Sequence, residues 1–352
     1  MSFNNRIFYA CQAVVIVPKT GDPVQTKGIA VRGLQSVGMS STFNLEQVFE
    51  LGQIEIYENI EEVADIEVTL EKAIDGRALI YQLASAGECA NNISAAAKNR
   101  CDVFLTIFTD ANDSIATTAP MNICWNSGMY TSSVSYSYSV DGSATESVTL
   151  VGNDRFWNTV KEPTGGTSAN AHFGTGVAPF AGLDNTDTPL SGVQRRVDVL
   201  VNDSDLPDIV KSQVGADSDS KHIQSISIST DFSQENILEL GRFGPYARYA
   251  TFPVEVTAEF EVIATSGDLV SVSGNTRNLG DGEPIKILDS AGTVIDLGNN
   301  CKLSSVSYSG GDTGGGNASV SYSFNTYNSL LVDGGNAADA EDNAEGTSTT
   351  RT

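Results

Sequence analysis

QSVGMSSTFNLEQVFELGQIEIY, residues 35–57, has a second version in the same chain, QSISISTDFSQENILELGRFGPY at residues 224–246. The two segments align without a gap at one constant offset, which places Glu50-Leu51-Gly52 on Glu239-Leu240-Gly241. A self-match of this length indicates one structural unit used twice. Open solenoids need three or more units, so two copies favour a ring or tube in which one chain fills two equivalent positions.

The match extends beyond these segments. An apolar, β-branched stretch follows each of them, at 63–70 and at 252–262, and deleting one residue aligns Glu67-Val68-Thr69 with Glu255-Val256-Thr257. A serine- and tyrosine-rich stretch at 134–138 is aligned with 320–324, and the apolar run 8–17 with 193–201. These matches predict four parts: a first domain at 1–151, a Gly- and Asn-rich linker or surface insertion at 152–189, a second domain at 190–332, and a flexible acidic tail at 333–352.

Strand patterns dominate the chain, because short runs rich in Val, Ile, Thr, Tyr and Phe alternate with Gly, Asn and Asp. Asp141-Gly142 predicts a tight hairpin turn. A short amphipathic helix is predicted at 75–84, with a further helical turn at 93–100. The predicted strands are 8–17, 51–57, 63–71, 103–109, 132–140 and 146–151, and the second copy adds hairpins at 284–297 and at 301–309 with 318–327.

Composition limits the classes of partner. The 352 residues include 44 Asp and Glu against 20 Lys and Arg, a formal charge of −24 that repels nucleic acid and anionic membranes. The chain has no long apolar run of membrane-spanning length, so no membrane insertion is predicted, and the apolar N-terminal stretch is interpreted as a strand rather than a signal peptide. The odd number of scattered cysteines favours buried thiols and assembly in a reducing cytoplasm, with a Cys89–Cys101 bridge as the alternative.

No catalytic, cofactor-binding or metal-binding residue is predicted, and the chain is not predicted to be an enzyme. The two histidines, His172 and His222, lie in polar sequence without a triad or metal-ligand pattern. Other candidates lack the rest of their motif: Asp217 with Asp219 and Asp184 with Asp187 as calcium ligands, and 310–317 as a phosphate loop. The tyrosine-rich strands could form a ligand platform, but packing or a subunit contact is favoured. The Glu-Leu-Gly motifs either close a turn, with Leu51 and Leu240 in the core, or form a subunit contact.

Residues 36–57, followed by Val68-Thr69-Leu70-Glu71-Lys72, resemble the tail tube proteins of tailed bacteriophages. The resemblance is strongest over 30–150 and weaker over 190–335. It implies a small β-sandwich or split barrel with a flanking helix and a long β-hairpin, six of which form a ring. Rings of this family stack around a channel. A duplicated chain departs from the common pattern, and it implies that three chains make one pseudo-hexameric ring.

The resemblance implies a structural function: trimeric rings stack into a tail tube whose acidic channel lets DNA pass without specific binding. The partners would be the chain itself and other tail proteins, namely sheath or tape measure, terminator, and baseplate or tip, in the virion tail. Hairpins 130–151 and 301–327 are predicted to carry ring-to-ring contacts. The alternatives are another virion protein, such as a capsid decoration or baseplate component, a glycan-binding adhesin that uses its tyrosines, and an enzyme with a pocket at His172 or His222.

Overall fold

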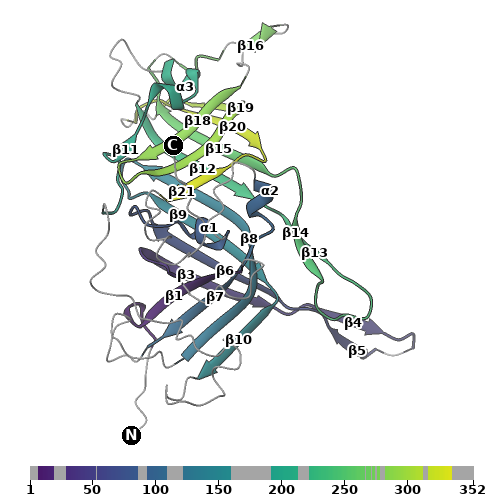
Figure 1. The fold of residues 1–352 in the computed structure, drawn as a ribbon. Coiled ribbons are helices and arrows are strands. Elements are labelled where there is room, and N and C mark those ends of the chain that lie inside the picture. Colours follow the sequence, from purple (N-terminus) through teal and green to yellow (C-terminus); the bar gives the residue numbers. More distant parts are fainter. Residues whose placement is uncertain are drawn as a thin grey trace.

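The computed structural model describes residues 7–19, 29–52, 54–85, 93–108, 122–159, 192–212, 222–265, 267–270, 272–273, 276–277, 282–311 and 316–334. Within them the protein is mainly β, as predicted, with one 15-stranded antiparallel sheet and three two-stranded ribbons beside it (Figure 1). Helix is confined to short segments. No helix among these residues has the length and apolar character needed to span a membrane.

The first half of the chain forms η1 (Tyr9–Cys11), β1 (Gln12–Lys19), β2 (Ile29–Ala30), β3 (Leu34–Thr42), β4 (Leu45–Phe49), β5 (Ile56–Glu61), β6 (Asp65–Ala73), α1 (Ile80–Ala84), α2 (Ile93–Ala96), β7 (Arg100–Ile107), β8 (Asn122–Ser139), β9 (Thr145–Gly152) and β10 (Asp154–Thr159). The second half forms β11 (Val199–Leu200), η2 (Asp203–Asp205), α3 (Asp208–Ser212), β12 (Ile223–Asp231), β13 (Gln234–Ile237), β14 (Ala247–Ala250), β15 (Glu255–Ile263), β16 (Val272–Ser273), β17 (Thr276–Arg277), β18 (Glu283–Asp289), β19 (Thr293–Ser309), β20 (Ser319–Tyr327) and β21 (Leu331–Gly334).

The same strand order occurs twice in the sheet. The first half pairs its strands as β7-β8-β9-β6-β3, and the second half as β18-β19-β20-β15-β12. β3 and β12 have the same bounds at the offset of the sequence repeat, and each has a bulge after its first residue, at Leu34/Ser36 and Ile223/Ser225. Ser36 Oγ donates to Glu71 (3.1 Å), and Ser225 Oγ donates to Glu261 (3.2 Å). We call these two strand sets the first and second repeats.

The structure corrects two of the predicted alignments. β20, which contains 320–324, pairs as β9 does, so it is not the counterpart of 134–138. The counterpart is on β19, where residues 304–309 repeat the SSVSYS of residues 132–137, and both strands have a bulge at the same place, Thr131/Ser133 and Leu303/Ser305. Strand pairing aligns Glu71 with Glu261, so the segment between the Glu-Leu-Gly motif and the next strand has one residue more in the second copy, not one fewer. Alternating serine and aromatic residues on neighbouring strands made these matches ambiguous in the sequence.

Most predicted elements are present with shifted bounds. The hairpin at Asp141-Gly142 joins β8 to β9, and both second-copy hairpins form as β18–β19 and β19–β20. The predicted strand at 51–57 is wrong, because a turn at Leu51-Gly52 separates β4 from β5. The predicted helix at 75–84 is helical only in α1, and α2 confirms helix within 93–100. β10 lies in the stretch predicted as a linker, while 160–191 and 335–352 lie outside the described residues.

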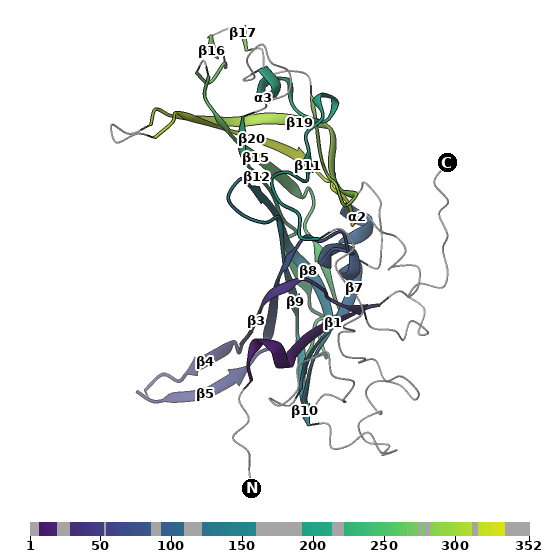
Figure 2. The same ribbon diagram turned by 90° about the vertical axis from the view of Figure 1, so that its left-hand side faces the viewer.

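One apolar cluster spans both repeats. It contains alternate residues of the long strands, such as Val68, Leu70, Val148, Ala258 and Phe260, which face the same side of the sheet. α1 and α2 lie on that side (Figure 2). Since the two repeats share this core and one continuous sheet, neither is a separate layer of the molecule.

Candidate self-association interface

β12 of the second repeat pairs with β8 of the first, and this junction joins the repeats within one chain. The register runs from Ser225 opposite Ser139 to Asp231 opposite Ser133. The Phe232 N–H extends it by donating to the Ser132 carbonyl oxygen (2.7 Å). The second half of β8 also pairs with β9, so both of its edges are occupied there.

Aromatic and aliphatic side chains fill the core side of the junction. Phe232 is 0% exposed, and its ring stacks on Tyr81 of α1 with 5.9 Å between centroids. Ile228 lies opposite Tyr136, which is also 0% exposed, and Ile226 lies opposite Tyr138. Burial of such side chains contributes about 1.5–3 kcal/mol each. The junction is therefore part of the hydrophobic core.

Polar contacts hold the ribbon β13–β14 against the first repeat. Arg248 of β14 donates to Asp65 (3.2 Å) and to the side-chain oxygen of Asn153 (3.2 and 3.3 Å). Gln234 of β13 donates to the Thr131 carbonyl oxygen (2.8 Å). Burial lowers the pKa of Arg248, but the neighbouring Asp65 carboxylate opposes that shift. An arginine stays charged in proteins, so Arg248 and Asp65 form a charge-assisted clamp at the junction.

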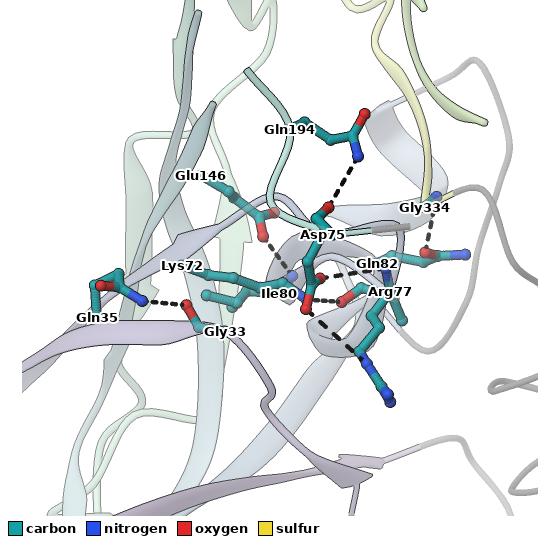
Figure 3. A network of polar contacts seen from close by, with 12 residues as sticks. Gly33, Gln35, Lys72, Asp75, Arg77, Ile80, Gln82, Glu146, Gln194 and Gly334 are labelled. Carbon is teal, nitrogen blue, oxygen red and sulfur yellow. Dashed lines mark hydrogen bonds and ion pairs between the residues drawn. The ribbon is translucent and has the colours of Figure 1, made fainter. Parts of the chain in front are cut away.

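A buried carboxylate organises the same region (Figure 3). Glu146 of β9 accepts hydrogen bonds from the backbone N–H groups of Ile80 (2.6 Å) and Tyr81 (3.0 Å), at the start of α1. It also accepts one from the Tyr136 hydroxyl (3.2 Å). Because Tyr81 stacks on Phe232 and Tyr136 lies opposite Ile228, Glu146 orients the first repeat's side of the junction.

Further polar contacts attach α1 to both repeats. The buried Lys72 donates to the Ala78 carbonyl oxygen (3.0 Å) and pairs with Asp75 (3.2 Å). The Gly334 N–H, at the end of β21, donates to Gln82 of α1 (3.1 Å) (Figure 3). The end of the second repeat is thus fastened to the helix of the first.

Glu146 makes the stability of the protein depend on pH. Burial raises its pKa, although its hydrogen bonds and Lys72 act against the shift. A carboxyl group with a raised folded-state pKa contributes stability that is complete below its unfolded pKa, about 4.3, and is lost as pH rises through the folded pKa. We expect the unfolding free energy of the wild type minus that of Glu146→Gln to fall as pH rises through that window, because only the wild type has this titrating group. Urea denaturation at stepped pH measures this; a constant difference contradicts it.

The two strands that form this junction have counterparts at the ends of the sheet. β3, the counterpart of β12, pairs with β6 alone among the described residues, and the second half of β19, the counterpart of β8, pairs there with β20 alone. Phe43, the counterpart of Phe232, is 72% exposed, and Tyr308, the counterpart of Tyr136, is 54% exposed. Each half of the internal junction is thus present a second time without its partner.

The face of the sheet opposite the core is acidic and rich in hydroxyl groups. β6 and β15 place glutamates on it, with Glu67 and Glu71 on the first and Glu255, Glu259 and Glu261 on the second. Serines and threonines of the neighbouring strands surround them, and Ser321 donates to Glu259 (2.6 Å). Along β3, β6, β9, β8, β12, β15 and β20 the one basic residue is Lys72, which is buried on the core side.

Two arms project from the sheet, residues 43–62 with β4–β5 and residues 232–251 with β13–β14 (Figure 1). Their Glu-Leu-Gly motifs form the turns, with Gly52 at φ 98° and Gly241 at φ 87°, a region that favours glycine. The prediction that Leu51 and Leu240 lie in the core is wrong: both side chains are fully exposed. Figure 2 shows the first arm extending well away from the sheet. The prediction that the Glu-Leu-Gly motifs close turns is confirmed, and their role in a subunit contact remains a prediction.

The other sequence candidates remain apart. His222 is exposed, and its backbone φ is 51°. Gly33 occupies the equivalent position in the first repeat. His172, the two acidic pairs and residues 312–315 lie outside the described residues. Among the residues that the structure places, no group of three or more His, Cys, Asp or Glu could hold a metal. Cys11, Cys124 and Cys301 are buried thiols, and Cys89 of the alternative bridge lies outside the described residues. Tyr136, Tyr138 and Tyr322 on these strands are buried, whereas Tyr308 and Tyr327 are more than half exposed.

No protein-family model matches the chain, and no curated protein matches it. Among solved structures, this chain is similar to a chain of the 6-fold symmetrised anti-feeding prophage baseplate. The match covers 46% of this chain and 100% of that chain, with a TM-score of 0.32 and 13% identity. A chain of the anti-feeding prophage tube terminating cap matches with the same score and identity, over 45% of this chain and 95% of that one. The chain is thus distantly similar to components of a phage-tail-like assembly over about half of its length.

Proposed function

We propose that this protein is a structural subunit of a phage-type tail tube. Each repeat is one tube domain, three chains close into a pseudo-hexameric ring, and rings stack around a channel for DNA. The observation that carries the proposal is the internal junction whose two halves recur without partners at the ends of the same sheet. A subunit with complementary open ends forms a closed ring when the rotation at each junction closes.

The acidic face of the sheet suits the wall of such a channel. Glutamates repel phosphates within about 10 Å at ordinary ionic strength, and small hydroxyl side chains leave the surface smooth. The seven strands named above carry no basic residue on this face, and the exposed Lys302 of β19, opposite Asn325, lies at its border. DNA would therefore pass without specific binding.

We assign the contacts between successive rings to the two arms rather than to hairpins 130–151 and 301–327. The strands of those hairpins lie within the sheet, and the tip of the first is bridged to Arg195 by Ser143. The arms instead project beyond the sheet and expose apolar residues such as Leu51, Leu240 and Phe243. Exposed apolar patches of this kind mark protein contacts.

The double variant Leu51→Ser, Leu240→Ser should therefore form rings that do not stack. Each exposed leucine contributes about 1.5–3 kcal/mol when it becomes buried, and the leucines of all three chains act together. Electron microscopy at matched protein concentration measures the ratio of single rings to tubes. Tubes of normal length from this variant would remove the arms from the stacking contact.

Other virion roles are the main alternative. A capsid decoration or baseplate component could have the same trimeric ring but would not form tubes. The adhesin alternative would use exposed tyrosines such as Tyr308 and Tyr327, because Tyr136, Tyr138 and Tyr322 are buried. The enzyme alternative would use His222, because His172 lies outside the described residues. The further partners we propose are other tail proteins, with assembly in the host cytoplasm and a final location in the virion tail.

Mass measurement of the purified chain tests the ring directly. The proposal predicts a species with three times the chain mass of 37.1 kDa, and larger multiples of that species as concentration rises. A chain that stays at 37.1 kDa up to high concentration, or that forms dimers alone, contradicts it.

A further inference from the structure

We propose that β3 of one chain pairs antiparallel with the second half of β19 of the next chain, in the register that β12 and β8 use inside the chain. The inference deepens the proposed ring by naming the edges and the residue pairs that close it. Its partner is a second copy of this chain.

The register follows from the two correspondences established by strand pairing. β3 maps onto β12 at the offset of the sequence repeat, so Ser40 corresponds to Ser229. β8 maps onto β19 through the shared SSVSYS sequence and the shared bulge, so Ser135 corresponds to Ser307. Inside the chain Ser229 lies opposite Ser135. Between chains, Ser40 therefore lies opposite Ser307, and Met39 lies opposite Tyr308.

Side-chain exposure supports the same match. Val37 and Met39 are only half-buried, whereas their counterparts Ile226 and Ile228 are buried by β8. Tyr308 of β19 is more than half exposed where Tyr136 is covered by β12. Joining the two edges would bury these residues as the internal junction already buries their counterparts.

Phe43 supplies an aromatic anchor for the new junction. Phe232, its counterpart, packs against α1, which follows β6. In the second repeat residues 267–270 follow β15 as residues 77–80 follow β6, because the strand pairing that aligns Glu71 with Glu261 also aligns Ala78 with Asp268. Leu269 is partly exposed there. We place Phe43 of one chain against Leu269 of the next.

The two edges also lack the usual barriers to strand pairing. Natural proteins protect open edges with charged residues or proline. β3 contains no charged residue and no proline, and residues 305–311 of the other edge read SVSYSGG. The pairing therefore brings no like charges together, in spite of the net charge of −24. An edge of this kind is suited to adding another strand.

Paired cysteines test the register in the full-length chain. Ser40→Cys with Ser307→Cys should give disulfide-linked dimers and trimers under mild oxidation. Ser229→Cys with Ser135→Cys, the internal counterpart, should cross-link within the chain without a change in mass. Ser40→Cys with Ser305→Cys should cross-link about tenfold less, because diagonal neighbours lie about 7–8 Å apart, beyond disulfide reach.

The outcomes separate this inference from the proposed tube. Tubes without the Ser40–Ser307 cross-link, or with equal yield from the off-register pair, would overturn the pairing and leave the tube function standing. Cross-linked closed trimers that never stack would support the pairing and count against the tube. If neither rings nor cross-links form, both the pairing and the tube function are overturned.

Discussion

Alanine at Phe232 and alanine at Phe43 should have opposite effects, although the two residues occupy the same position in the two repeats. Phe232→Ala should lower the free energy of unfolding by about 3–5 kcal/mol, because it leaves a cavity beside Tyr81 in a closed core. Phe43→Ala should change monomer stability by less than about 0.5 kcal/mol, because the side chain is exposed. Its effect should instead fall on ring formation.

The assembly defect of Phe43→Ala follows from the same packing. Loss of about 1.5–3 kcal/mol at each chain-to-chain junction reduces each association constant about 10- to 100-fold. Denaturant unfolding of the dilute monomer and sedimentation at a range of concentrations give the two quantities. Equal destabilisation of the monomer by both variants, or normal rings from Phe43→Ala, would show that the two phenylalanines do not play equivalent parts in internal and external junctions.

Reversing the charge of the acidic face should turn a surface that repels DNA into one that retains it. The variant carries Glu67→Lys, Glu71→Lys, Glu259→Lys and Glu261→Lys, and it raises the formal charge of the chain from −24 to −16. Tubes of this variant should bind short linear duplex DNA. With six to ten phosphate contacts, the affinity should fall by about 10³–10⁵ between roughly 50 and 200 mM salt.

The form of the DNA shows whether this face lines a channel. Linear DNA can enter an open-ended tube, whereas a closed circular plasmid cannot. The variant tubes should therefore retain linear DNA and release the circle. Equal retention of both forms by the face variant would place the acidic face on the outside of the assembly.

Local residue patterns predicted the repeated unit well. The gap-free match marked 35–57 and 224–246 as equivalent, although it did not identify β3 and β12 as strands, and the turn residues Asp141-Gly142 marked their hairpin, because those signals depend on neighbours in sequence. Strand partners were harder to predict. The stretches 134–138 and 320–324 share a serine and aromatic alternation, but the period of two fits any strand of such a sheet.

The junction could not be predicted, since it depends on long-range contacts. Phe43 and Phe232 look alike in sequence, and only the pairing of β12 with β8 separates an exposed residue from a buried one. For the same reason the sequence wrongly suggested that Leu51 and Leu240 lie in the core. Glu146 did carry a signal that was missed: it alternates in step with Val148 and Leu150, which marks it as a residue of the core side.

The most direct test of the whole account is electron microscopy of the purified protein over a range of concentrations. The account predicts hollow rings with threefold symmetry and a sixfold outline, which stack into tubes as concentration rises. Compact monomers or isolated trimers at every concentration, even after the other tail proteins are added, would contradict it.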